Sequence, residues 1–231
     1  MANITFGEIW VEVQERFLDS KKAMLKADAL RWANDTIKDV IHETDCYTAE
    51  QNVTLVESAQ DLTLSPTPMR IIAASYWDST NETWIPLDYT TARNWFEEGW
   101  DRKVSSDYEG RPKNYKWEPG KSTAYVYPPP DSDSAGDYIY FLYAKYPTAL
   151  TADASIVTEI TPEELQKDVL IPRILYYAYL QEEGLAKSQE DRAFFAAKKN
   201  SSLAEWHRGL DRFRRGRNKA GRRREKVLFE S

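Results

Sequence analysis

The sequence predicts an α+β fold: a helical bundle built from the N- and C-terminal segments, with an inserted small antiparallel β-sandwich or barrel and a basic C-terminal arm. Three patterns in the 231 residues predict it. Apolar residues recur every three or four positions near both ends, apolar and polar residues alternate in between, and arginines crowd the last 25 positions. We therefore expect an N-terminal helical pair (1–48), a β-rich insert (49–150), C-terminal helices packing on that pair (151–213) and a basic arm (214–231).

Two apolar stripes predict the N-terminal helices. The first consists of Phe6, Ile9, Trp10, Val13 and Phe17. The second consists of Leu25, Ala29, Trp32, Thr36, Ile37, Val40 and Ile41. Such stripes mark helix faces that turn toward a core. With Asp19–Ser20 as a cap between them, we expect an antiparallel pair joined by a short turn.

Seven short segments read as antiparallel strands, because alternating side chains and flanking turn residues are typical of strands. They are Val53–Val56, Leu62–Leu64, Met69–Trp77, Trp84–Asp88, Tyr115–Glu118, Ser122–Tyr127 and Asp137–Tyr146. In the last segment, both sets of alternating positions from Tyr138 to Ala144 are apolar or aromatic. This pattern predicts an inner strand or a strand that is covered on both faces.

The C-terminal helices have clear boundaries in the sequence. Thr161 and Glu164 suit a capping box around Pro162, and Pro172 should kink or split the helix that follows. A last helix from Ser188 carries the stripe Phe195, Ser202, Trp206, Leu210 and Phe213. Three glycines, Gly209, Gly216 and Gly221, are expected to weaken it progressively.

Composition argues against several classes of protein. One cysteine and two histidines leave almost no basis for the usual metal or nucleophilic sites, and neither a phosphate-binding loop nor a convergent carboxylate pair is recognisable. No apolar segment approaches the ~20 residues of a membrane span, and the first residues lack a signal-peptide pattern. We expect no catalytic residues, no metal, no cofactor and no membrane partner.

The charge is divided unevenly along the chain. Residues 207–231 hold ten basic and three acidic residues, a net charge of +7, whereas residues 1–206 carry −13. The arm could neutralise nucleic-acid phosphates. Alternatively, it could order on an acidic protein surface, with Val227, Leu228 and Phe229 as an apolar plug. A third reading is a solvated, disordered tail.

The order of motifs resembles the head-to-tail adaptor proteins of tailed bacteriophages, particularly the tail tubular protein A type. The similar segments are Leu30–Ile37, Met69–Ile72, the turn with Gly110, Pro112 and Tyr115, the strand Ala124–Asp131 with its three prolines, and Tyr138–Pro147. The resemblance spans roughly residues 5–190. The arginine-rich arm lies outside it, so its role rests on its charge and its apolar terminus.

This resemblance implies a non-enzymatic ring, expected to be a dodecamer, at the head–tail junction of the virion and assembled in the cytoplasm of the bacterial host. The ring would dock on the portal protein, present a platform for the tail nozzle and let double-stranded DNA pass. From the segregation of charge and the apolar terminus we assign portal docking to Arg214, Arg215, Arg217, Arg222, Arg223, Arg224 and Phe229. The main alternative is a nucleic-acid-binding protein that uses the arm on phosphates. A carbohydrate-binding β-module is a further alternative and requires an exposed aromatic row.

Overall fold

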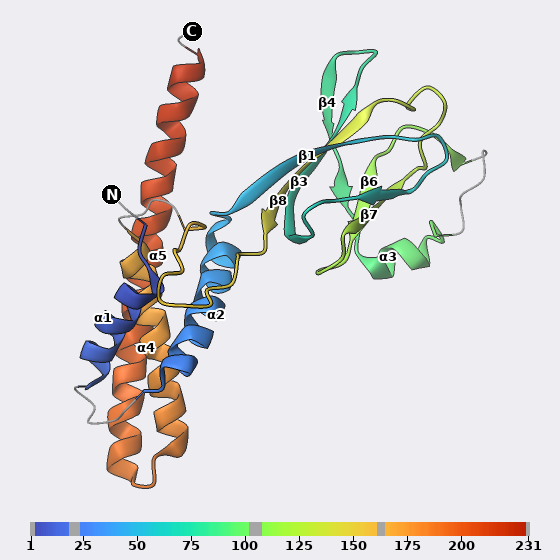
Figure 1. Cartoon of the computed structure of the whole chain (residues 1–231). Coiled ribbons are helices and arrows are strands. Elements are labelled where there is room, and N and C mark those ends of the chain that lie inside the picture. The colour runs from blue at the N-terminus through green and yellow to red at the C-terminus, as the bar shows by residue number, and fades with distance from the viewer. Residues whose placement is uncertain (1–2, 19–23, 102–107, 161–164, 230–231) are drawn as a thin grey trace. The chain divides into compact units, whose positions relative to one another are not determined.

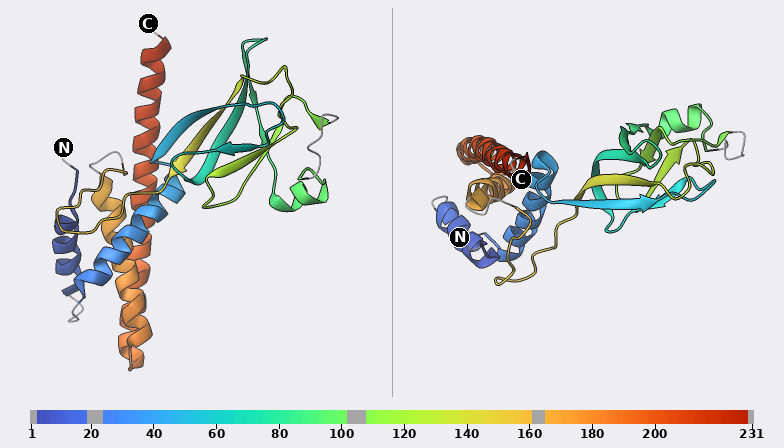
Figure 2. Two further views of the ribbon diagram at one scale, coloured as in Figure 1. Left: turned by 45° about the vertical axis from the view of Figure 1, so that its right-hand side comes forward. Right: turned by 90° about the horizontal axis from the view of Figure 1, so that it is seen from above.

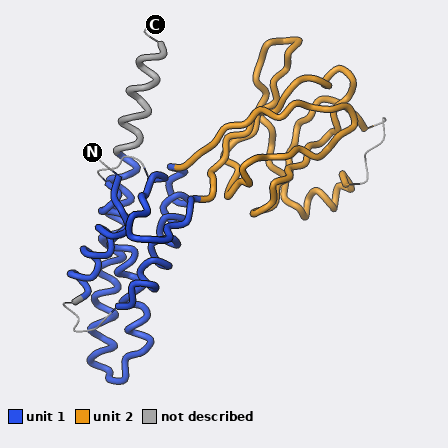
Figure 3. Tube along the Cα trace, in the orientation of Figure 1, with its two compact units in different colours: residues 1–46, 147–231 blue, residues 47–146 orange. Residues whose placement is uncertain are grey.

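The computed structural model describes residues 3–18, 24–101, 108–160 and 165–229, with the backbone alone at residue 18 and at residues 216–229. The chain forms five helices and two four-stranded sheets within these ranges, which confirms the α+β class (Figure 1). It divides into two compact units (Figure 3). Unit 1 comprises residues 1–46 and 147–231 and is helical, and unit 2 comprises residues 47–146 and contains both sheets.

Unit 1 is a bundle of four helices whose apolar stripes face one another. They are α1 (Phe6–Leu18), α2 (Lys26–Thr44), α4 (Gln166–Leu185) and α5 (Gln189–Phe229). α1 and α2 run in opposite directions, and α4 and α5 lie side by side in every view (Figures 1 and 2). Both N-terminal stripes are confirmed except at Leu25, which precedes α2 and is 69% exposed. The predicted cap at 19–20 lies outside the described residues.

Thr5 and Glu8 begin α1 with a capping box that the sequence analysis missed. The Glu8 amide donates to the Thr5 hydroxyl, and the Glu8 carboxylate accepts from the Thr5 amide at 2.8 Å. These bonds satisfy donors that a helix start leaves free. The hydrogen bonds from Thr5 also lower the pKa of Glu8.

One outcome expected at Pro172 is wrong: α4 runs through this proline as one helix, so the proline does not split it, and the kink stays a prediction. α5 continues from Gln189 to Phe229, past all three glycines. Arginine and lysine are good helix formers, and a glycine costs only about 1 kcal/mol, so these glycines are not enough to end α5. Ser188 caps α5 by accepting a hydrogen bond from the Asp191 amide. The expected capping box at 161–164 lies outside the described residues.

Unit 2 consists of two sheets that share one core. The first has the order β1 (Thr48–Thr54), β8 (Tyr138–Lys145), β3 (Pro68–Asp78), β4 (Thr83–Pro86). The second has the order β2 (Asp61–Thr63), β7 (Thr123–Tyr127), β6 (Asn114–Trp117), β5 (Asp88–Tyr89). β8 is an inner strand, as predicted. The expectation of purely antiparallel pairing is wrong at one place, because β5 pairs with β6 in parallel.

The core of unit 2 joins both sheets. Phe141 on β8 and Tyr115 on β6 meet edge to face with ring centroids 6.2 Å apart, and Val126 on β7 is fully buried beside them. A short helix, α3 (Ala92–Glu97), begins at Thr91, whose side chain accepts from the Asn94 amide. Trp95 of α3 packs on Tyr125 and Tyr127 of β7, so this helix covers part of the outer face of the second sheet.

Tyr76 should make the stability of unit 2 sensitive to alkaline pH. Its hydroxyl donates to the Asp137 carboxylate, and burial together with this carboxylate raises the pKa of Tyr76 to about 12. In an unfolded chain, the pKa of a tyrosine is about 10. The raised pKa therefore stabilises the fold fully below pH ~10 and progressively less as the pH rises toward 12. In an absorbance titration at 295 nm, Tyr76→Phe should remove a late-titrating group, and coincident curves for variant and parent would contradict this assignment.

Candidate docking surface

The exposed cations of α5 begin within unit 1 itself. Arg208, Arg212, Arg214 and Arg215 are all exposed on this helix. Arg214 is held at the end of α2, because its guanidinium donates to both the carbonyl oxygen and the carboxylate of Glu43 at 3.0 Å. Arg215 makes no ion pair with any residue whose side chain the structure describes. The side chains of Arg217, Arg222, Arg223, Arg224 and Phe229 lie outside the described part of the chain.

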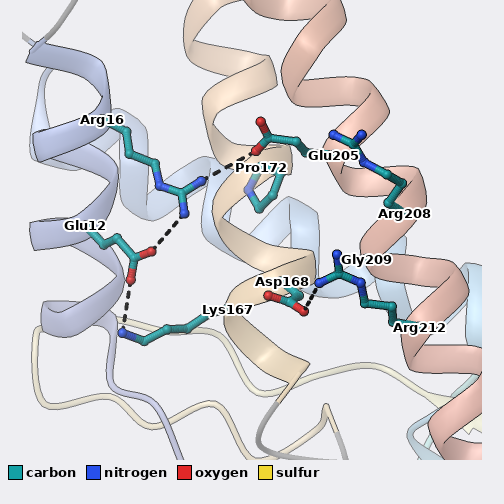
Figure 4. Close-up of a pocket in the computed structure, with 9 residues that line it drawn as sticks. All are labelled: Glu12, Arg16, Lys167, Asp168, Pro172, Glu205, Arg208, Gly209 and Arg212. Atoms are coloured by element: carbon teal, nitrogen blue, oxygen red, sulfur yellow. Dashed lines mark hydrogen bonds and ion pairs between the residues drawn. The ribbon is translucent and has the colours of Figure 1, made fainter.

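A charged groove of about 430 Å³ opens between α1, α4 and α5, and its lining is drawn in Figure 4. The lining consists of Glu12, Arg16, Lys167, Asp168, Pro172, Glu205, Arg208, Gly209 and Arg212. Four cations and three carboxylates thus meet where three helices come together. No pattern in the sequence indicates this groove, since its residues come from three distant segments.

Ion pairs tie the groove's carboxylates to its cations. Glu12 accepts from Arg16 at 3.1 Å and from Lys167 at 3.0 Å, and Asp168 pairs with Arg212 at 3.0 Å. Arg16 also reaches Glu205 across the groove, at 3.5 Å. These are exposed pairs, so each adds little stability, but together they hold the side chains in fixed positions.

Arg208 differs from the other cations of the groove. It lies at the rim without an ion pair or hydrogen bond to another described residue (Figure 4). Because a guanidinium stays charged and presents several donors in one plane, it can accept a carboxylate or an aromatic face from outside. The groove is therefore a candidate docking surface, and Arg208 is its one cation without an ion pair to a described side chain.

Pro172 and Gly209 explain how the floor of the groove is built. Proline has no N–H to donate to the carbonyl oxygen of Asp168, four residues earlier. Gly209 of α5 lies directly against that oxygen, and a Cβ at this position would be 2.2 Å from it. The close approach of α4 and α5 thus depends on a glycine that the sequence alone presents only as a weak point.

A partly buried cluster joins α2, α4 and α5. Arg173 donates from Nε and Nη2 to the Oδ2 atom of Asp39 at 3.0 and 2.8 Å, and the Tyr177 hydroxyl donates to the same atom at 2.9 Å. The guanidinium also lies 4.3 Å from the ring centroid of Trp206. Burial, followed by the bond to Asp39, raises the pKa of Tyr177.

The turn with Gly110, Pro112 and Tyr115 is structural within unit 2. The Gly110 amide donates to the Pro129 carbonyl at 2.8 Å, Pro112 is buried, and Tyr115 lies in the core on β6. Gly110 has ordinary backbone dihedrals, and a Cβ there would meet Pro128 only at 3.9 Å. This turn positions β6, and its three residues lie far from the groove in sequence and belong to the other unit.

Four aromatic residues on the outer face of the first sheet of unit 2 form a cluster in which Trp84 is exposed and the other three are half-buried, and which we call the aromatic face: Trp77, Trp84, Tyr138 and Tyr140. Trp77 pairs in register with both Trp84 and Tyr138, so the three side chains share the outer face of the first sheet. Trp84 is 46% exposed. The alternation in residues 138–144 signalled aromatic residues on both sides of β8, but only the strand order shows that one row stays uncovered.

The described residues contain no group of three His, Cys, Asp or Glu side chains placed to hold a metal ion. Among the same residues, no helix has the length and apolar character that a bilayer crossing demands. The chemistry that the surface does offer consists of paired ions, a free guanidinium and aromatic rings, which are groups suited to contacts between macromolecules.

A bundle with a charged groove and a β-unit with an aromatic face are features suited to contacts with other macromolecules. The comparison with known families makes this specific. The family model described as SU10 adaptor protein matches residues 4–224, so the chain belongs to this family of phage head-to-tail adaptor proteins. Its members are structural components of the virion. No curated protein matches the chain. The finer resemblance to the tail tubular protein A type stays a prediction.

Proposed function

We propose that the chain is a subunit of the phage neck that forms a ring, expected to be a dodecamer, joins the portal to the tail nozzle and lets double-stranded DNA pass. The family match over residues 4–224 carries this proposal. α5 supports it, because a 41-residue helix brings the basic run of the sequence to one end of a folded bundle. The ring would assemble in the host cytoplasm as portals become available.

In this proposal, the basic arm docks on an acidic part of the portal. Arg215 is exposed at its beginning, and Arg217, Arg222, Arg223 and Arg224 follow along the same helix. Arg214 also forms an ion pair with Glu43, which attaches the beginning of the arm to the end of α2. Phe229, near the end of the helix, would supply an apolar contact.

Ending the chain after Phe213 should leave a folded protein that no longer joins portal rings. Phe213 is fully buried and is the last residue of the apolar stripe of α5, so the truncation removes none of the described core. Co-sedimentation with portal rings measures the binding, and circular dichroism checks the fold. Arg93→Gln, on exposed α3, is the matched control and should bind normally. A truncated chain that still binds portal rings would remove the arm from this role.

The ten basic residues in positions 207–231, eight of them in the arm itself, also support the alternative that the arm binds nucleic acid without a portal. Each phosphate contact contributes about 0.9 to the slope of log affinity against log salt concentration. Portal-free, sequence-independent DNA binding with a slope that corresponds to several phosphates would favour this alternative. We expect at most weak binding, since residues 1–206 carry a net charge of −13.

A further inference from the structure

The aromatic face is a surface without a partner in the described part of the chain. Its rings pack against one another. The ring centroids of Trp77 and Trp84 lie 5.0 Å apart, and those of Trp77 and Tyr138 lie 6.1 Å apart with the rings stacked. Trp84 meets Tyr140 edge to face, with a centroid distance of 5.9 Å. The neighbours of these residues along the strands, such as Tyr76 and Ile139, are buried in the core. Aromatic side chains gathered outside a core are a common feature of protein interfaces.

The charge around this face indicates the chemistry of what covers it. Unit 2 holds nine basic and fifteen acidic residues, a net charge of −6. At the rim, burial and the negative charge of Glu50 raise the pKa of Tyr140. The faces of aromatic rings attract cations, and arginine is the usual one. The covering surface should therefore present guanidinium groups.

The groove of unit 1 presents guanidinium groups. It brings together Arg16, Lys167, Arg208 and Arg212, of which Arg208 has no described partner, around a volume of about 430 Å³. The chain already uses the same pairing inside its units: Arg173 lies over Trp206 and Arg111 lies 5.7 Å from the Tyr76 ring centroid. An aromatic side chain that enters the groove would meet Arg208 in the same way.

We propose that the aromatic face of one copy docks into the groove of a second copy, with Trp84 against Arg208. Two unlike, complementary patches on one chain give a head-to-tail contact, which generates a ring when the rotation closes. Contact between two aromatic faces would instead bring together two units of charge −6. This inference rests on the proposed ring and names the surfaces that form its lateral contact.

A photo-crosslinker tests this contact directly. The full chain, with a benzophenone amino acid in place of Trp84, is mixed with an isotope-labelled, otherwise identical copy and assembled on portal rings. Illumination should join position 84 of the unlabelled copy to the segment around Arg208 of the labelled copy, which mass spectrometry identifies. The same group in place of Tyr89, an exposed aromatic residue on the second sheet, should give no such product. Arg208→Glu should reduce the product from position 84 by about tenfold or more, the equivalent of about 1.4 kcal/mol.

Three outcomes would overturn the inference: a product with a different protein, a product with another segment of the second copy, or no product in complexes that have formed. Each of them leaves the adaptor role intact, because portal binding is measured in the same sample. If the parent chain itself does not bind portal rings, the proposed function fails, and the lateral contact fails with it. An undiminished product with Arg208→Glu would remove the role of that guanidinium.

Discussion

Gly209→Ala should lower the free energy of unfolding of unit 1 by about 2 kcal/mol, because overpacking a close contact typically costs ~1–3 kcal/mol. The new Cβ would stand 2.2 Å from the carbonyl oxygen of Asp168 and 2.9 Å from its carbonyl carbon. Both are backbone atoms of α4, so no side-chain rotation relieves the clash. α5 must instead move away from α4 or tilt.

The displacement would spread from this point. Asp168 pairs with Arg212, and two residues earlier the buried Gln166 bonds to the Ile4 amide and to the carbonyl oxygens of Val157 and Ile160. Because both clashing atoms belong to the backbone, we expect an overpacking cost at the upper end of the ~1–3 kcal/mol range, about 3 kcal/mol, which the gain of about 1 kcal/mol in helix propensity reduces to a net loss of about 2 kcal/mol. The net effect is therefore destabilising, with a melting temperature lower by about 4–8 °C.

Gly184→Ala is the matched control. Gly184 lies in α4, is exposed, and has no atom within 4 Å of the position that a Cβ would take. Here the propensity gain acts alone, so this variant should be more stable than the parent by up to ~1 kcal/mol. Urea unfolding followed by circular dichroism measures both variants. Equal stability of the Gly209 variant and the parent would show that the two helices do not meet at this residue.

The same glycine shows which parts of the fold the sequence can predict. The stripes of α1 and α2 and most strands were predicted correctly, because side chains that face a core repeat with the period of the local structure. From the sequence alone, a glycine inside a helical pattern indicates only that the helix is less stable at that position. Its real role comes from the neighbouring helix, where Pro172 leaves the Asp168 carbonyl without its usual donor.

β1 illustrates a second limit of the sequence. Residues 53–56 were predicted as the strand, but β1 spans Thr48–Thr54 and begins with polar residues. It is an edge strand whose partner is β8, and its outward positions carry Thr48, Glu50 and Asn52. Pairing with an apolar inner strand determines this structure more than the strand's own composition does, which is the general behaviour of strands.

The candidate site could likewise be predicted only where its residues are neighbours in the sequence. The basic arm could be recognised because ten charges lie within 25 consecutive positions. The groove could not, since Glu12, Lys167 and Arg208 meet only after three helices pack. The aromatic face was anticipated only as a requirement of a carbohydrate-binding alternative. Four rings now meet on one sheet, and the acidity of their unit favours a cationic protein partner.

Arg173→Met should destabilise unit 1 by about 2–3 kcal/mol, somewhat less than the ~3–5 kcal/mol typical of breaking a fully buried ion pair. The Arg173 side chain is 17% exposed and that of Asp39 is 33% exposed, so water partly solvates the carboxylate left behind. The variant keeps a long apolar chain over Trp206 but removes two hydrogen bonds and the cation. Arg173→Lys should recover only part of the loss, because an ammonium cannot stack on the ring or donate in a planar fork.

A double-mutant cycle separates the pair from its surroundings. Asp39→Asn alone should cost a similar amount, and the double variant should cost less than the two single variants together, with a coupling of about 1–2 kcal/mol. Lys38→Met provides the control on the same helix. It breaks the exposed Asp35–Lys38 pair, 3.4 Å long, and should change stability by less than about 0.5 kcal/mol.

Tyr177 supplies an independent readout of the same cluster. Its hydroxyl donates to Asp39, which together with burial raises its pKa. Asp39→Asn removes the negative charge beside the phenol, so Tyr177 should ionise at a lower pH than in the parent, whereas Lys38→Met should leave its titration unchanged. Additive single variants and an unmoved Tyr177 titration would contradict the lock between α2, α4 and α5. A positive cycle would show that one guanidinium joins α2 to α4 and α5, two of the three helices that form the groove, so that loss of Arg173 should also weaken the docking surface assigned to Arg208.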